Sequence, residues 1–333
     1  MFSRDIGIDL GTANVLIYVK GRGIVLDEPS VVAIDTGTGR ALAVGEEARQ
    51  MVGRTPGNIV ATRPLKDGVI ADFDITEVML RHFLNKINVK SFLSKPRILI
   101  CTPTNITSVE KKAIKEAAEK SGGKQIFLEE EPKVAAIGAG MDIFQPSGNM
   151  VVDIGGGTTD IAVLSMGDIV TASSIKMAGD KFDHEILDYI KKTYKLLIGE
   201  RTAEQIKINV ATVFPGGRNE ELDIRGRDMV SGLPRTITVK SDEIQQALQE
   251  PISHMVMAAK SVLERTPPEL SADIIDRGVI MTGGGALLHG IDQLFAEELM
   301  VPVLVAEEPM SCVAKGTGLM LEHIDKIAKK KLI

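Results

Sequence analysis

The stretch VVDIGGGTTDIAVL, residues 151–164, joins an apolar run ending at Asp153, a turn of three glycines and a second apolar run. This pattern predicts a β-hairpin with a tight glycine turn. Residues 5–18, DIGIDLGTANVLIY, repeat the pattern, and aligning Asp9 with Asp153 also superimposes a glycine in each turn. A hairpin repeated half a chain apart predicts two related domains that each open with the same unit.

A third apolar run, in GVIMTGGGALLHGI of residues 278–291, also ends in glycines but is expected to continue as a helix. Predicted strands and helices alternate along the rest of the chain, which favours α/β domains with helix-covered sheets. The expected strands cover residues 29–34, 41–44, 97–101, 126–128, 222–227 and 235–239, and the expected helices cover residues 76–86, 108–121, 181–197, 202–211 and 242–264.

Length and composition limit the class of protein. The chain has 333 residues, 44% of them hydrophobic and 25% charged, which suffices for about two domains with cores of their own. A net charge of -6 argues against a nucleic-acid partner. Its cysteines, Cys101 and Cys312, cannot build a disulfide framework or a zinc cluster. Without a signal peptide or an apolar run of about 20 residues, we expect a cytoplasmic protein.

The two hairpin turns carry the chemistry. A glycine turn exposes consecutive backbone N–H groups, and such a nest binds anions, phosphate above all. Asp9 and Asp153 end their strands beside the turns, where a carboxylate can hold hydrated Mg²⁺ against phosphates. Side chains that can add donors are those of Thr12, Asn14, Thr158 and Thr159. The alternative, two ordinary hairpins with turn-forming residues, does not account for the matched repeat.

These motifs resemble those of the actin/Hsp70/sugar-kinase ATPase fold. Over essentially its whole length the chain is similar to the bacterial actins of the MreB family, whose two domains enclose a nucleotide cleft. The resemblance rests on five blocks: DIGIDLGTANVLIY at 5–18, LEEEPKVAAIGAG at 128–140, VVDIGGGTTDIAVL at 151–164, GERTAEQIK at 199–207 and TGGGALLHG at 282–290. One departure is Lys133-Val134, where many relatives carry Met-Ala.

The resemblance implies a domain plan. Domain I would cover residues 1–140, with a small subdomain inserted at about 30–75, and domain II residues 141–312, with an insertion at about 180–255. The residues from 313 to 333 would form a C-terminal helix that returns to domain I.

The resemblance also implies ATP and Mg²⁺ as cofactors, with Asp9 and Asp153 holding the metal through water. The residues implied to bind ATP are Thr12, Ala13, Asn14, Gly156, Gly157, Thr158, Glu204, Gln205, Ile206, Lys207, Gly284, Gly285, Ala286 and Leu287. Without the resemblance, Glu204 and Lys207 would indicate a solvated salt bridge across one helical turn.

Hydrolysis of ATP needs a group that orients the attacking water. Our first choice is Glu131, which precedes Pro132 and the predicted interdomain helix, and Thr158 is a second contact for the water. Glu129 is the backup, since strand alternation would point it to the same side as Glu131. These glutamates are equally compatible with a charge cluster at a helix N-terminus.

The function that the resemblance implies is a weak ATPase whose turnover is coupled to polymerisation. The protein would assemble with further copies of itself and with related bacterial actins into paired filaments. These filaments would lie at the inner face of the cell membrane. There they would control rod shape and direct cell-wall synthesis with membrane proteins of elongation. The alternative is a small-molecule, sugar-type kinase, although no convincing catalytic Asp is found beyond the metal carboxylates.

A membrane anchor is expected at Phe92 and Leu93, two large apolar residues in a predicted loop that resembles the family's membrane-inserting loop. The alternative is that both side chains pack on the core. Met1-Phe2 would add a second apolar finger, and the basic residues of 326–331 would attract anionic lipid or form a solvated helix end.

Overall fold

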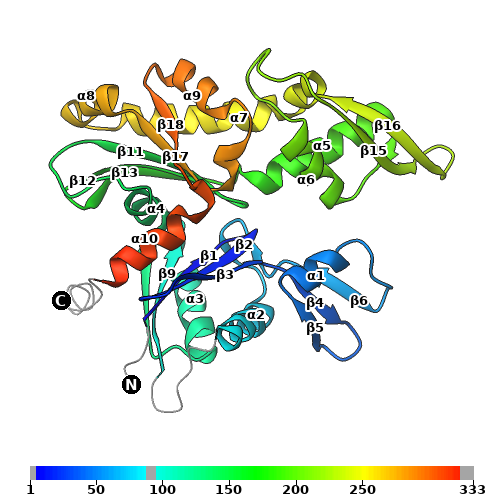
Figure 1. Ribbon diagram of the computed structural model, residues 1–333, viewed down its shortest axis with the longest axis horizontal. Helices are drawn as coiled ribbons and strands as arrows, with labels where there is room; N and C mark the ends of the chain where they lie inside the picture. The colour runs from blue at the N-terminus through cyan, green and yellow to red at the C-terminus, as the bar shows by residue number, and fades with distance from the viewer. Residues whose placement is uncertain (1–4, 88–94, 323–333) are drawn as a thin grey trace. The chain divides into compact units, whose positions relative to one another are not determined.

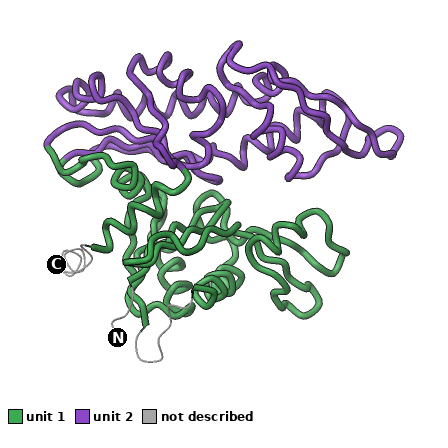
Figure 2. Tube along the Cα trace, viewed as in Figure 1, with its two compact units in different colours: residues 1–145, 166–169, 310–333 green, residues 146–165, 170–309 purple. Residues whose placement is uncertain are grey.

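The computed structural model describes residues 5–87 and 95–322, which divide into two compact units (Figure 2). Unit 1 comprises Met1–Gln145, Met166–Ile169 and Met310–Ile333, and unit 2 comprises Pro146–Ser165 and Val170–Pro309. Each unit contains a five-stranded sheet with a buried apolar core (Figure 1).

The two large sheets share one topology. The strand order is β10-β9-β1-β2-β3 in unit 1 and, from the corresponding edge, β18-β17-β11-β12-β13 in unit 2. In both, an antiparallel hairpin (β1–β2 or β11–β12) adjoins two parallel strands. The strands are β1 (Ile6–Leu10), β2 (Asn14–Val19), β3 (Gly23–Pro29), β9 (Arg97–Thr102) and β10 (Gln125–Glu130), and then β11 (Asn149–Ile154), β12 (Thr159–Ser165), β13 (Asp168–Ile175), β17 (Val279–Thr282) and β18 (Val303–Val305). This equivalence confirms the predicted repeat.

The remaining elements of unit 1 cover its sheet or form a small appendage. A three-stranded sheet with α1 has its own apolar cluster, and α2 and α3 pack together. The capping box expected of a strong helix start is present at α3, where Thr107 and Glu110 bond reciprocally. The elements are β4 (Val32–Asp35), β5 (Ala41–Val44), α1 (Glu46–Met51), β6 (Ile59–Thr62), β7 (Leu65–Lys66), β8 (Val69–Ile70), α2 (Phe73–Lys86), α3 (Ser108–Lys120), α4 (Glu131–Gly138), η2 (Pro309–Ser311) and α10 (Cys312–Leu321).

Helices α4 and α10 approach each other at backbone distance, because glycines face the contact. A β-carbon on Gly138 would lie 1.8 Å from the Cys312 carbonyl oxygen, and one on Gly316 would lie 2.0 Å from the Val134 carbonyl oxygen. A β-carbon on Gly318 would lie 2.5 Å from Cζ of Tyr18, which lies on β2. The C-terminal helix is therefore fixed to the first sheet by contacts that no larger residue permits.

Unit 2 adds helices to its sheet and carries a second, three-stranded sheet. The long helix α7 packs on β12, α5 and α9. The β15–β16 hairpin pairs with the short strand β14. The elements are α5 (Gly179–Tyr194), β14 (Leu196–Leu197), α6 (Glu200–Asn209), β15 (Glu221–Asp228), β16 (Pro234–Lys240), α7 (Ser241–Glu264), α8 (Pro268–Arg277), η1 (Gly284–Leu287) and α9 (Ile291–Leu299).

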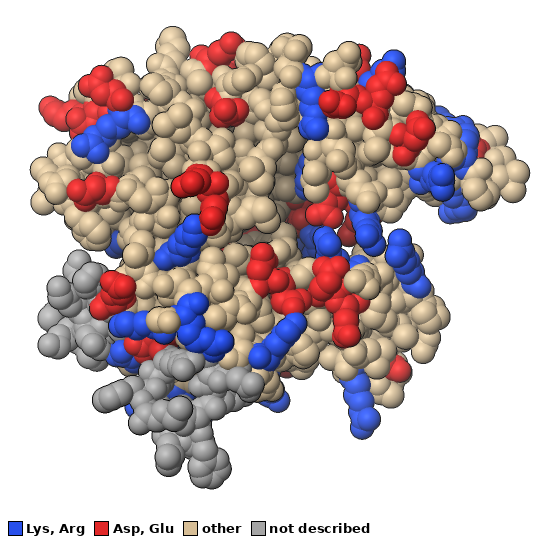
Figure 3. All heavy atoms as spheres, viewed as in Figure 1, with Lys and Arg blue, Asp and Glu red and all other residues tan. Residues whose placement is uncertain are grey.

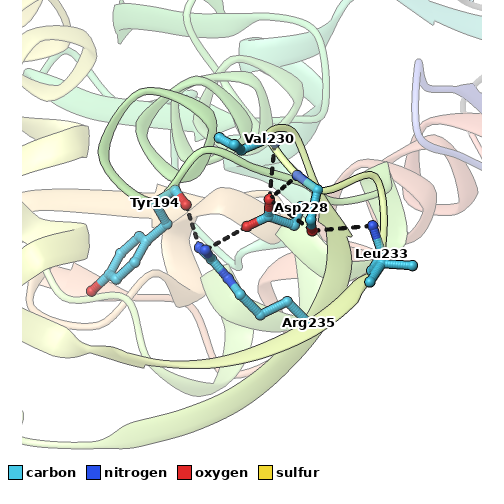
Figure 4. A network of polar contacts seen from close by, with 6 residues as sticks. Tyr194, Asp228, Val230, Leu233 and Arg235 are labelled. Atoms are coloured by element: carbon cyan, nitrogen blue, oxygen red, sulfur yellow. Dashed lines mark hydrogen bonds and ion pairs between the residues drawn. The ribbon is translucent and has the colours of Figure 1, made fainter.

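The tip of the β15–β16 hairpin is held by Asp228 (Figure 4). Its Oδ1 accepts the N–H of Val230 at 2.9 Å and of Ser231 at 2.8 Å, and its Oδ2 accepts Arg235 Nη1 at 2.5 Å. Hydrogen bonds from Ser231 and Val230 hold the pKa of the Asp228 carboxyl below its usual range. Arg235 also donates to the Tyr194 carbonyl, so the tip is tied to the end of α5.

Three sequence-based boundaries are wrong. Residues 29–34 are not one strand, because β3 ends at Pro29 and β4 begins at Val32. The helix expected to reach residue 197 ends at Tyr194, since Lys195 takes a left-handed φ of 52° and the next two residues join the sheet as β14. The third glycine turn continues as the 3₁₀ helix η1, and α9 begins only at Ile291.

Charge on the surface is mixed in sign. On the face drawn in Figure 3, acidic and basic side chains are interspersed over both units. Among residues 5–87 and 95–322, no helix combines the length and apolarity that a membrane crossing requires.

Candidate functional site

The first glycine turn, residues 11–14, closes the β1–β2 hairpin, in which Leu10 pairs with Val15. Gly11 is required there, because a β-carbon would lie 2.6 Å from the Asn14 carbonyl oxygen. Ser30 fixes the outer side of the turn, donating its Oγ to the Gly11 carbonyl at 2.6 Å and its N–H to the Ala13 carbonyl at 2.9 Å.

The carbonyl groups of Gly11 and Ala13 thus point toward Ser30. No hydrogen bond among the described residues uses the N–H groups of Thr12 and Ala13, which stay available to an anion. Both side chains expected to add donors have partners within unit 1: Thr12 Oγ1 accepts the Gly68 N–H at 2.9 Å, and the Asn14 amide donates through Nδ2 to Asp27 Oδ1 at 2.8 Å. The turn therefore offers backbone donors, while its side chains hold its shape.

The second turn, residues 155–158, closes the equivalent hairpin, where Ile154 pairs with Thr159. Its carbonyls are also engaged: those of Gly155 and Gly156 accept the N–H groups of Gly179 at 3.1 Å and Asp180 at 2.8 Å. Both N–H groups belong to the first turn of α5, where backbone N–H groups have no acceptor within their own helix. In the described structure the N–H groups of Gly156, Gly157 and Thr158 remain uncommitted.

Asp153 lies two residues before this second turn, on the buried strand β11. Its side chain is 5% exposed, and its Oδ1 accepts a hydrogen bond from Thr282 Oγ1 at 2.6 Å. Burial raises the pKa of Asp153 to about 6, and the charge of Asp160, directly opposite on β12, adds to the effect. A nearby cation stabilises the ionised form of such a buried carboxyl. The raised pKa of Asp153 therefore fits a residue that holds Mg²⁺.

Asp9 occupies the matching place on β1 and is only half-buried. The described residues contain no group of three or more His, Cys, Asp or Glu able to hold a metal by themselves. Mg²⁺ bound together with phosphates needs only one or two carboxylates, since waters and phosphate oxygens complete its shell. Asp9 in unit 1 and Asp153 in unit 2 are each a carboxylate of the kind that this mode of binding uses.

The third glycine turn packs directly on the end of β11. A β-carbon on Gly283 would lie 2.3 Å from the Ile154 carbonyl oxygen, and one on Gly285 would lie 2.2 Å from Ile154 Cγ2. Within unit 2 the structure therefore brings residues 284–287, which the resemblance implies bind ATP, beside the second hairpin turn. Ala286 is buried, whereas the Leu287 side chain is 59% exposed and free to border a ligand.

Residues 204–207, which the resemblance implies bind ATP, lie within α6. Ile206 is fully buried in the core, so its side chain anchors the helix. Lys207 is not a solvated partner of Glu204: its Nζ lies 2.9 Å from Asp183 Oδ2 and 3.2 Å from the Gly179 carbonyl oxygen. Asp183 and Gly179 were not among the predicted site residues, because their only signal in the sequence is a position in the first turns of the helix that follows β13.

The three glutamates at 129–131 span the junction of β10 and α4 in unit 1. Glu131 is the first residue of α4 and is buried, whereas Glu129 and Glu130 are half-buried on the strand. Strand alternation therefore does not relate Glu129 to Glu131, contrary to our expectation, because the helix has already begun. Burial raises the pKa of Glu130, and Asp168 adds to the effect. Phe92 and Leu93 lie outside the described residues.

Paired glycine hairpins on equivalent sheets define an actin-like nucleotide-binding fold. In each sheet an aspartate, Asp9 or Asp153, is the next-to-last residue of the first hairpin strand. Residues 3–329 match the family described as MreB/Mbl protein. The chain belongs to the MreB/Mbl family.

Individual relatives agree with this assignment. The cell shape-determining protein Mbl of Bacillus cereus is 80% identical over 332 residues, which cover 100% of both chains. The crystal structure of MreB 5 of Spiroplasma citri bound to AMPPNP is 39% identical, with a TM-score of 0.94 over 99% of each chain. The MamK double helical filament shares the fold. It is 20% identical, with a TM-score of 0.80 over 96% of this chain and 98% of MamK.

Proposed function

We propose that this protein binds and hydrolyses ATP and assembles into membrane-associated actin-like filaments that control rod cell shape and direct cell-wall synthesis. The observation that carries the proposal is the matched pair of hairpin turns, each with carbonyls engaged from outside and N–H donors left for an anion. Full-length similarity to a cell shape-determining protein supports the biological role.

In this proposal the phosphates are bound by residues 12–14 of unit 1 and by residues 156–158 of unit 2. Glu204 and Lys207 contact the ribose, and residues 284–287 border the adenine. Mg²⁺, held through water by Asp9 and Asp153, would neutralise charge on the phosphates. A homologous structure contains AMPPNP, a non-hydrolysed relative of ATP, which supports this class of ligand.

Glu131 orients the attacking water in the proposed hydrolysis, with Thr158 as a second contact and Glu129 as the backup. Burial of Glu131 at the first residue of α4 supports a positioned carboxylate, because a buried side chain has few alternative conformations. Hydrolysis is expected to be slow and coupled to assembly.

The proposed partners are further copies of this chain, related bacterial actins and membrane proteins of cell-wall elongation. The proposed location is the inner face of the cell membrane, with Phe92 and Leu93 as the lipid contact. The shared fold does not by itself imply a filament, so assembly has to be tested directly.

The test combines electron microscopy with phosphate release. Purified protein with ATP, Mg²⁺ and anionic liposomes should form filaments that lie on the lipid, and phosphate should appear without any acceptor molecule. Asp153→Ala should abolish turnover while the fold persists. Phosphate release that depends on an added sugar-like acceptor, with no filaments over a wide protein concentration range, would contradict the proposal and favour a kinase.

A further inference from the structure

Asp183 is a largely buried carboxylate that none of the nucleotide motifs includes. It lies on α5 with its side chain 13% exposed, and its Oδ2 is 2.9 Å from Lys207 Nζ on α6. Its Oδ1 is buried and has no hydrogen-bond partner among the described residues. A buried charge with an unsatisfied oxygen is destabilising, so its presence calls for a role beyond packing.

Lys207 is held by two acceptors at once. Besides Asp183, its ammonium group donates to the Gly179 carbonyl at 3.2 Å, and its side chain is only 18% exposed. A lysine ammonium has three N–H donors in tetrahedral arrangement. When two donors are fixed by protein acceptors, the direction of the third is set as well, and that donor remains for a ligand.

Gly179 connects this ion pair to the second phosphate turn. Its N–H donates to the Gly155 carbonyl at 3.1 Å, and the N–H of the next residue, Asp180, donates to the Gly156 carbonyl at 2.8 Å. One residue thus bonds to Lys207 through its carbonyl and to the turn through its N–H. A shift of Lys207 would therefore be transmitted to the turn through two hydrogen bonds, the one from Lys207 to the Gly179 carbonyl and the one from the Gly179 N–H to the Gly155 carbonyl.

We propose that Asp183 is a positioning residue for the sugar of the nucleotide, holding Lys207 so that its third donor meets a ribose hydroxyl while Gly179 keeps the phosphate turn in register. This inference rests on the proposed ATP-binding function and adds the element that couples the sugar and phosphate ends of the ligand. Asp183 acts through Lys207, without contacting the nucleotide.

The charges around Asp183 add a pH dependence. Burial raises the pKa of Asp183 to about 6, Lys207 opposes the shift, and Glu204 and Asp180 reinforce it. As the pH falls through about 6, the carboxyl takes up a proton and the ionic contact with Lys207 weakens. Recognition of the ribose should therefore fade below pH 6.

The test compares ATP with 2′-deoxy-ATP and 3′-deoxy-ATP in equilibrium binding at pH 8. The wild type should prefer ATP over at least one analogue by about tenfold, the scale of one hydrogen bond to a charged group. Asp183→Asn should reduce this preference to about twofold or less. The matched control is Asp188→Asn on the same helix, where a carboxylate that is 38% exposed lies 3.8 Å from Lys192 Nζ and the preference should be unchanged.

Lys207→Met removes the other partner of the Asp183–Lys207 ion pair, and it serves as the test if Asp183→Asn does not fold. It should lose the preference to the same extent, and the double variant should lose no more, because both changes remove one interaction. A folded variant of either residue that keeps the full preference would overturn the inference, as would a wild type that binds ATP and both analogues equally. A wild type that binds neither ATP nor inorganic tripolyphosphate would instead contradict the proposed function.

Discussion

Replacing Asp153 with Asn should stabilise the nucleotide-free protein while abolishing Mg-ATP turnover. Asn has nearly the same size and keeps an oxygen that can accept the Thr282 hydroxyl, so packing around β11 is preserved. It removes the charge that burial makes unfavourable, the same burial that raises the Asp153 pKa from 3.8 to about 6. At about 1.4 kcal/mol per pKa unit, ionising Asp153 costs the folded state about 3 kcal/mol above pH 6.

The pH dependence of this effect has a definite sign. The folded protein holds the Asp153 proton more tightly than the unfolded chain, so this contribution to stability is complete below about pH 4 and lost as the pH rises through about 6. Thermal unfolding in EDTA should therefore show little difference between wild type and Asp153→Asn at pH 4. By pH 8 the variant should melt several degrees higher.

The matched control for this comparison is Asp276→Asn, which changes an exposed carboxylate on α8 of the same unit. Its melting temperature should follow that of the wild type at every pH. The reasoning would be refuted if Asp153→Asn melted below the wild type at pH 8, or if the gap between them did not widen between pH 4 and pH 8. Phosphate release measured on the same samples should be lost in Asp153→Asn alone.

Three further changes test other parts of the structure. Gly316→Ala should destabilise the protein by about 1–3 kcal/mol in denaturant unfolding, since its β-carbon would lie 2.0 Å from a backbone oxygen, whereas Gly57→Ala, in open space, should change little. Glu131→Ala should slow phosphate release by about 100-fold while ATP binding persists, and loss of binding would indicate a structural role. Exchanging Phe92 and Leu93 for Asp should reduce co-sedimentation with anionic vesicles, and unchanged co-sedimentation would remove them as the anchor.

Much of the fold was predictable because local patterns and tertiary structure agree. Apolar runs that end in glycine turns predicted both hairpins, and their alignment predicted that β1 and β11 occupy equivalent places in two sheets. The boundary errors arose where long-range pairing competes with local propensity. Leu196 and Leu197 continue a helical pattern in the sequence, yet their backbone groups pair with β15 once the hairpin is in place.

The sequence by itself determined where the two tight hairpin turns lie, because such turns follow directly from glycine at fixed spacing. Only the tertiary structure decided how the side chains around those turns are used. Thr12 and Asn14 shape their turn, and Lys207 is fixed by Asp183, a residue with no motif of its own. The physical reason is that hydrogen-bond partners and burial depend on residues far apart in the chain, whereas a glycine turn depends on its immediate neighbours.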